Sequence, residues 1–82
     1  MSKQTKIVQG VKVSLDPSVF DDVELQEKIE AGQVIGAIKA VVGEDTYQEA
    51  KEALKKEGRT KLTDLATWYA KCAEEFGVST KN

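Results

Sequence analysis

The chain has 82 residues, of which 32% are charged, and its formal net charge is −2 at pH 7. A chain of this length forms one domain with a small core, since a protein of this size buries only about 60% of its unfolded surface. It has one cysteine, Cys72, and no histidine, so an intramolecular disulfide, a zinc site and a histidine general base are all excluded. We therefore expect a protein that is not an enzyme, with no catalytic residue, metal or cofactor.

The distribution of apolar and charged residues bears on location and partners. No apolar run approaches the roughly 20 residues that span a bilayer, and no apolar segment follows the first lysines as in a secretory signal. We expect an intracellular protein with no membrane contact. Residues 21–58 hold ten acidic side chains against five lysines. Nucleic-acid binding depends on Lys and Arg at phosphates, so this balance counts against a nucleic-acid partner.

The N-terminal part of the chain predicts one strand. Residues 1–9 are polar and are expected to be disordered. From Val11 to Leu15 apolar and polar residues alternate, which is typical of a short half-buried strand. A single strand must lie against helices, pair with a second copy or accept a strand from a partner. Val11, Val13 and Leu15 are therefore candidate partner-binding residues, and self-association is one possible use of this edge.

Four short helices are expected after the strand. Asp16 with Pro17 can cap the first helix, Asp21 offers a second start, and Gly32 ends it. The other helices are expected at residues 34–42, 45–57 and 62–76, with glycines at 43, 58 and 77 after them. The predicted fold is mainly α: a small bundle of four short helices preceded by one short N-terminal β-strand. It forms a single helical domain over residues 10–77, followed by a polar tail at 78–82.

Apolar residues three and four apart predict which helix faces are buried. The predicted faces contain Val19, Phe20, Val23 and Ile29 in the first helix; Val34, Ile35, Ile38, Val41 and Val42 in the second; Tyr47, Ala50, Ala53 and Leu54 in the third; and Leu62, Leu65, Ala66, Tyr69, Cys72, Ala73 and Phe76 in the fourth. Trp68 lies at the margin of the fourth face. It either completes the core or serves as a partner-binding anchor, a role for which tryptophan is enriched.

Two glycines invite comparison with ligand-binding loops. Gly43 is followed by Glu44 and Asp45, whose carboxylates would repel a phosphate at a helix N-terminus, and the chain has no Gly-x-x-x-x-Gly-Lys-Ser/Thr pattern. If Gly58 took the sixth position of a calcium loop, two ligands would remain and a lysine would point into the site. Both glycines are therefore predicted to end helices.

The order of three segments resembles a known family. They are Asp21-Asp22-Val23-Glu24-Leu25, then Gly43-Glu44-Asp45-Thr46-Tyr47, then Gly58 leading into Leu62-Thr63-Asp64-Leu65. This order is similar to that of the small tail assembly chaperones of long-tailed phages and prophages, in their short form, over about residues 11–77. The resemblance implies a protein in the cytoplasm of the bacterial host, absent from the mature virion. It also implies binding of the tape measure protein and the tail tube subunit during tail assembly.

A second class of function stays open. Residues 33–58 could form a helix-turn-helix, as in a small DNA-binding regulator encoded by a phage or mobile element. Such a regulator needs basic residues on its second helix, whereas residues 44–58 have five acidic side chains against three lysines. The sequence thus favours a binding module for proteins over a regulator.

Overall fold

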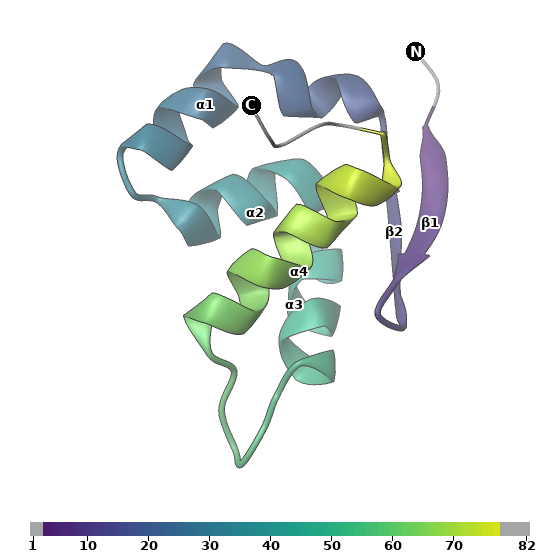
Figure 1. The fold of residues 1–82 in the computed structure, drawn as a ribbon, viewed down its shortest axis with the longest axis vertical. Helices are drawn as coiled ribbons and strands as arrows, with labels where there is room; N and C mark the ends of the chain where they lie inside the picture. Colours follow the sequence, from purple (N-terminus) through teal and green to yellow (C-terminus); the bar gives the residue numbers. More distant parts are fainter. Residues whose placement is uncertain (1–2, 78–82) are drawn as a thin grey trace.

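The structure is a computed structural model that describes residues 3–77 (Figure 1). Helices dominate it, as predicted, but it begins with two strands in place of one. The elements in chain order are β1 (Gln4–Val8), β2 (Val11–Leu15), the 3₁₀ helix η1 (Pro17–Asp21), α1 (Val23–Glu30), α2 (Val34–Val42), α3 (Glu44–Ala53) and α4 (Leu62–Glu75). The polar tail predicted at residues 78–82 lies outside the described residues.

The first two strands form an antiparallel hairpin in which Val8 pairs with Val11 and Gln4 pairs with Leu15. Gln9 and Gly10 connect the strands with φ of 51° and 84°, the backbone of a type I′ turn whose twist matches that of the strands. The prediction that residues 1–9 are disordered is therefore wrong for residues 4–8. Strand pairing orders this polar segment, and Val8 is buried at its end.

Two aspartates cap the next two helical segments. Asp16 Oδ1 accepts a hydrogen bond from the backbone N–H of Ser18 at 3.0 Å, which caps η1 as predicted and lowers the pKa of Asp16. Asp22, not Asp21, caps α1 by accepting from the backbone N–H of Glu24 at 3.3 Å. The predicted apolar face of this region is partly wrong. Phe20 and Leu25 are buried, while Val23 is 68% exposed and Ile29 is 39% exposed.

Gly43 joins α2 directly to α3. Its φ of 92° and ψ of 158° let the chain end one helix and start the next at a single residue, a conformation that is essentially restricted to glycine. A 3.6 Å ion pair between Lys39 and Glu44 spans the corner. The pKa of Glu44 is lowered, first by a hydrogen bond from Gln48 and then by Lys39. The predicted corner at Gly43 is confirmed.

The third helix is shorter than predicted, because α3 ends at Ala53 and not at Glu57. The following residues form a second tight turn: the backbone N–H of Lys56 donates to the carbonyl of Arg59 at 2.7 Å, and the reverse bond measures 3.1 Å. Glu57 and Gly58 at its tip have φ of 52° and 84°. The hydroxyl of Thr60 donates to the carbonyl of Lys51 at 2.7 Å. These bonds hold the turn against the end of α3.

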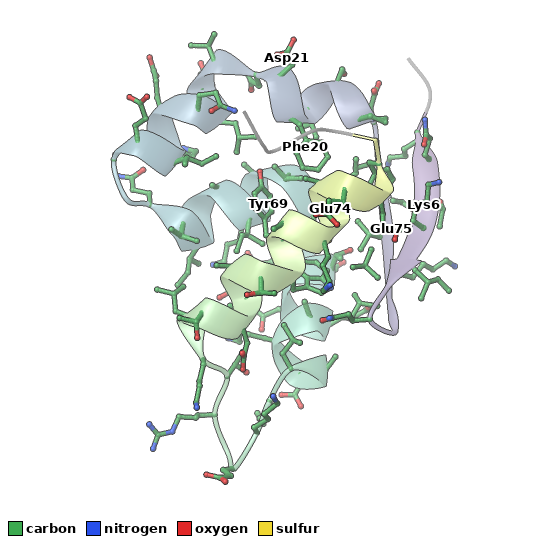
Figure 2. All side chains as sticks on the ribbon, viewed as in Figure 1. Lys6, Phe20, Asp21, Tyr69, Glu74 and Glu75 are labelled. Carbon is green, nitrogen blue, oxygen red and sulfur yellow. The ribbon has the colours of Figure 1, made fainter. Side chains whose placement is uncertain are left out.

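One apolar core joins the hairpin to the helices. α4 packs against β1, while α2 and α3 pack against β2. Phe20 from η1 lies beside the C-terminal half of α4, with ring centroids 6.0 Å from Tyr69 and 6.5 Å from Phe76 (Figure 2). The core residues are Val8, Val11, Val13, Leu15, Phe20, Leu25, Ala37, Ile38, Val41, Val42, Tyr47, Ala50, Leu65, Trp68, Cys72, Ala73 and Phe76.

Candidate partner-binding surface

The four residues predicted to bind partners lie inside the core. Their exposed fractions are 3% for Val11, 0% for Val13, 4% for Leu15 and 0% for Trp68. β1 pairs with β2, α4 packs against β1, and α2 and α3 pack against β2. The indole Nε1–H of Trp68 donates to the carbonyl oxygen of Val8 at 3.1 Å. The prediction of a free strand edge at Val11, Val13 and Leu15 was therefore wrong, because it lacked the strand that pairs with them. For Trp68 the core alternative is confirmed.

Cys72 is also a core residue. It lies on the inner side of α4 and is fully buried. Burial, and secondarily the negative charge of Glu75, raise the pKa of its thiol to about 12. A nucleophilic cysteine needs a lowered pKa and solvent access. The environment of Cys72 thus maintains a protonated, enclosed thiol at neutral pH.

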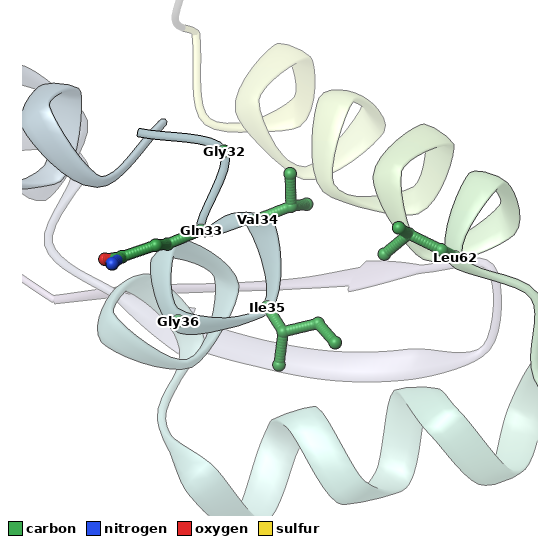
Figure 3. Close-up of a pocket in the computed structure, with 6 residues that line it drawn as sticks. All are labelled: Gly32, Gln33, Val34, Ile35, Gly36 and Leu62. Carbon is green, nitrogen blue, oxygen red and sulfur yellow. The ribbon is translucent and has the colours of Figure 1, made fainter. Parts of the chain in front are cut away.

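An apolar cleft lies where the starts of α2 and α4 approach each other (Figure 3). Ile35 is 43% exposed and Leu62 is 52% exposed, although both were predicted to face the core. Figure 3 shows Leu62 pointing from α4 toward Val34, with Ile35 beside it on α2. The cleft has a volume of about 250 Å³. It is lined by Gly32, Gln33, Val34, Ile35, Gly36 and Leu62.

Local sequence explains why this cleft is open. Gly32, with φ of 79°, reverses the chain between α1 and α2, so Ile35 falls in the first turn of α2. Gly36 follows it, and a side chain at this position would meet only Gln33, at 4.0 Å. Leu62 is the first residue of α4. Both exposed aliphatic residues thus lie in the first turns of their helices.

A polar groove adjoins the apolar cleft. It has a volume of about 290 Å³ and is lined by Glu24, Glu27, Lys28 and Gln33. Gln33 lines both hollows, so they form one continuous surface across α1, α2 and the start of α4. We call this surface the α1–α2–α4 face.

A basic turn leads into the other side of this face. Residues 55–61 contain three lysines and one arginine against a single glutamate. Lys55 forms a 3.0 Å ion pair with Glu52, while Lys56, Arg59 and Lys61 are exposed. Lys61 directly precedes Leu62. Lys61 is therefore close to the apolar cleft, while Lys56 and Arg59 pair across the tip of the turn.

A further exposed aliphatic residue lies on the hairpin. Ile7 is 69% exposed on the outer face of β1, opposite Lys12. The hairpin also carries Lys3 and Lys6 and no acidic residue between positions 3 and 15. Lysines on edge strands commonly oppose pairing with another chain. Ile7 is isolated, and it provides a matched control for the residues of the cleft.

Sequence reasoning missed Ile35 and Leu62 as surface residues because their spacing matches the buried stripe of each helix. Their position in the chain is the feature that could have predicted their exposure. Each follows a chain reversal by a few residues, where a short helix has not yet met its packing partner. No segment of residues 3–77 is a helix long and apolar enough to cross a membrane.

Comparisons with protein-family models, with curated proteins and with solved structures gave no match.

Proposed function

We propose that the protein is a non-enzymatic tail assembly chaperone of a phage or prophage, which binds the tape measure protein and the tail tube subunit during tail assembly. The proposal combines the family resemblance with one structural observation. Two aliphatic side chains, Ile35 and Leu62, stand exposed on either side of an apolar cleft. The proposed site of action is the cytoplasm of the bacterial host, before the virion is complete.

The cleft suits a protein client for a physical reason. Covering exposed aliphatic surface stabilises a complex by about 25 cal/mol for every Å² removed from water. Clusters of exposed aliphatic residues with a polar rim mark interaction sites. Ile35 and Leu62 can each be covered by one client side chain. Glu24, Glu27 and Lys28 line the adjoining groove, and Lys61 directly precedes Leu62, so polar groups border the cleft.

The volume of the cleft argues for side-chain anchors over a cofactor. Pockets for small molecules usually measure about 300–1,000 Å³ and enclose most of the ligand. The cleft and the adjoining groove measure about 250 and 290 Å³, and the side chains of Ile35 and Leu62 beside the cleft are about half exposed. A client chain laid across them would use the cleft as a socket for one or two apolar side chains.

Co-expression with the two proposed clients tests the function. The tape measure protein and the tail tube subunit from the same phage are each produced with the wild-type chain, with the Ile35→Gln/Leu62→Gln variant, or alone. We expect the wild-type chain to raise the soluble fraction of the tape measure protein and to co-purify with it. The variant should lose both effects. If neither client gains solubility or co-purifies with the wild-type chain, the proposal is wrong.

A helix-turn-helix regulator is the weaker alternative. The direct connection of α2 to α3 through Gly43 is compatible with such a motif, but α3 carries four carboxylates against one lysine. A recognition helix of that charge would be repelled by phosphate groups. A mobility-shift assay with duplex DNA at low salt separates the two proposals, and we expect no shift.

A further inference from the structure

The turn between α3 and α4 is basic and projects from the bundle (Figure 1). Within residues 55–61, Lys56, Arg59 and Lys61 are exposed and take part in no ion pair among the described residues. The backbone groups of Lys56 and Arg59 exchange hydrogen bonds of 2.7 and 3.1 Å across the tip, which fix the shape of the turn. The turn therefore presents these three cations on a rigid projection.

The groove beside α1 has the complementary charge. It has a volume of about 290 Å³ and is lined in part by Glu24, Glu27 and Lys28, and residues 21–30 hold five carboxylates against one lysine. Neither glutamate takes part in an ion pair within residues 3–77. Val23, which is 68% exposed, lies one helical turn before Glu27 on the same side of α1. This side of α1 thus offers carboxylates to a cationic head group and an apolar side chain to its aliphatic stem.

The basic turn and the acidic groove lie at opposite ends of the molecule. In Figure 1, which is drawn with the longest axis vertical, α1 lies at one end and the turn between α3 and α4 projects at the other. The molecule measures 37 Å along this axis, whereas exposed charges act over only about 10 Å at 0.1 M salt. The turn of one chain therefore cannot be neutralised by the groove of the same chain, but it can reach the groove of a second copy.

We infer that copies of this chain associate head to tail, with the basic turn of one copy seated in the acidic groove on α1 of the next. A second copy is the occupant that the charges indicate, because one chain supplies both the cationic projection and the anionic hollow. Such a contact is heterologous: each copy uses its turn on one neighbour and its groove on another, so the assembly continues past a dimer or closes into a ring. The inference goes beyond the proposed function and does not depend on which clients bind.

The contact should be weak and sensitive to salt. Exposed ion pairs each contribute little to the stability of a complex, and their attraction is screened when the salt concentration rises. The fixed shape of the turn works in the other direction, because a preorganised segment loses less entropy on binding. We therefore expect a reversible association that depends on protein concentration and disappears at high salt.

Sedimentation velocity of the full chain tests the association. The wild type is measured over a range of protein concentrations at about 0.01 M salt, where charges act over roughly 30 Å, and at about 1 M salt, where they act over roughly 3 Å. The groove variant Glu24→Gln/Glu27→Gln and the turn variant Lys56→Gln/Arg59→Gln each remove one half of the contact. All four side chains are exposed, so both variants should keep the fold.

We expect the mean mass of the wild type to rise past that of a dimer at low salt and to return to that of a single chain at high salt. The groove variant alone and the turn variant alone should each associate about tenfold more weakly, because exposed charge pairs are lost. An equimolar mixture of the two variants should form dimers and no larger species, since each pair contains one intact turn and one intact groove.

A hairpin variant provides the matched control. Lys3→Gln/Lys12→Gln removes as many positive charges as the turn variant does, but from the other basic segment of the chain, and it should assemble as the wild type does. A wild type that stays monomeric at low salt overturns the inference. So does a mixture of the groove and turn variants that associates no better than either variant alone, or a hairpin variant that loses assembly as fully as the turn variant.

Discussion

The indole Nε1–H of Trp68 and the backbone carbonyl of Val8 form a buried 3.1 Å hydrogen bond across 60 residues of sequence. It joins the middle of α4 to the last residue of β1. The only tryptophan of the chain thus connects the hairpin to the bundle. The side chain that the sequence offered as a possible surface anchor is therefore part of the core.

Replacing Trp68 should therefore reduce stability. We expect Trp68→Phe to lower the free energy of unfolding by about 2–3 kcal/mol, because it removes the hydrogen bond and leaves a void beside the hairpin. Thr67 is an exposed neighbour on the same helix. Thr67→Ala should change the free energy of unfolding by less than about 0.5 kcal/mol. Urea titration followed by circular dichroism measures both. Similar losses from the two variants would contradict the role given to Trp68.

Replacing Gly36 and Gly43 by alanine should change the free energy of unfolding in opposite directions. Gly36 lies inside α2 with ordinary helical backbone, and the nearest atom to an added Cβ is Gln33 Cβ at 4.0 Å. Gly36→Ala should raise the free energy of unfolding by about 0.5–1 kcal/mol, because alanine is the better helix former. Gly43 has a φ of 92°, so Gly43→Ala should lower the free energy of unfolding by about 1–3 kcal/mol. The sign of each change in urea midpoint is the test.

The free energy of unfolding should fall at high pH, because the buried Cys72 thiol resists ionisation in the folded chain. The pKa of Cys72 is raised from 9.0 to about 12, by burial first and by Glu75 second. Above pH 9 the unfolded chain loses this proton while the folded chain keeps it. The stabilising effect is therefore complete below pH 9 and is lost between about pH 9 and 12, with a slope of about 1.4 kcal/mol per pH unit.

Comparison with Cys72→Ala isolates this effect from the titration of lysines. The variant should show a shallower loss of stability over the same pH range. The pKa of Tyr69 is also raised, by burial and then by Cys72, so part of the loss should remain. Equal slopes for the wild type and the variant would show that the thiol does not contribute.

Removing the apolar side chains of the cleft should leave the fold intact. Ile35 and Leu62 are 43% and 52% exposed, so the double change to glutamine should alter the free energy of unfolding by about 1 kcal/mol at most. Client binding should nevertheless be lost. Ile7→Gln, which removes an equally apolar and more exposed side chain, should retain client binding. A double variant that unfolds would show that these residues support the core.

Sequence periodicity predicted the four helices and the corner at Gly43, because those features depend on local residues. It failed at the hairpin, since only Ile7 and Val8 in residues 3–9 are strongly apolar. The order of β1 comes from pairing with β2 and from the contact of Val8 with Trp68. The contact with Trp68 is 60 residues away in sequence and leaves no local pattern. The pairing with β2 is local, but residues 3–6 lack the apolar alternation that marks a strand.

The candidate surface was harder to predict than the fold. Val11, Val13 and Leu15 look like one face of a free strand when the strand that precedes them is missing. Ile35 and Leu62 look like core residues when only their helical spacing is considered. Their exposure depends on how the helices pack against one another and against the hairpin, which is a property of the tertiary arrangement.

The most direct test of the central claim is to map the client-binding surface by backbone amide chemical shifts. A soluble tape measure fragment is titrated into the isotopically labelled full chain. We predict that the largest shifts fall on residues 32–36 and on Lys61 and Leu62, with smaller ones on α1 and the basic turn. Shifts concentrated on β1 and the outer face of the hairpin, with none around the cleft, would contradict the claim that the α1–α2–α4 face binds the client.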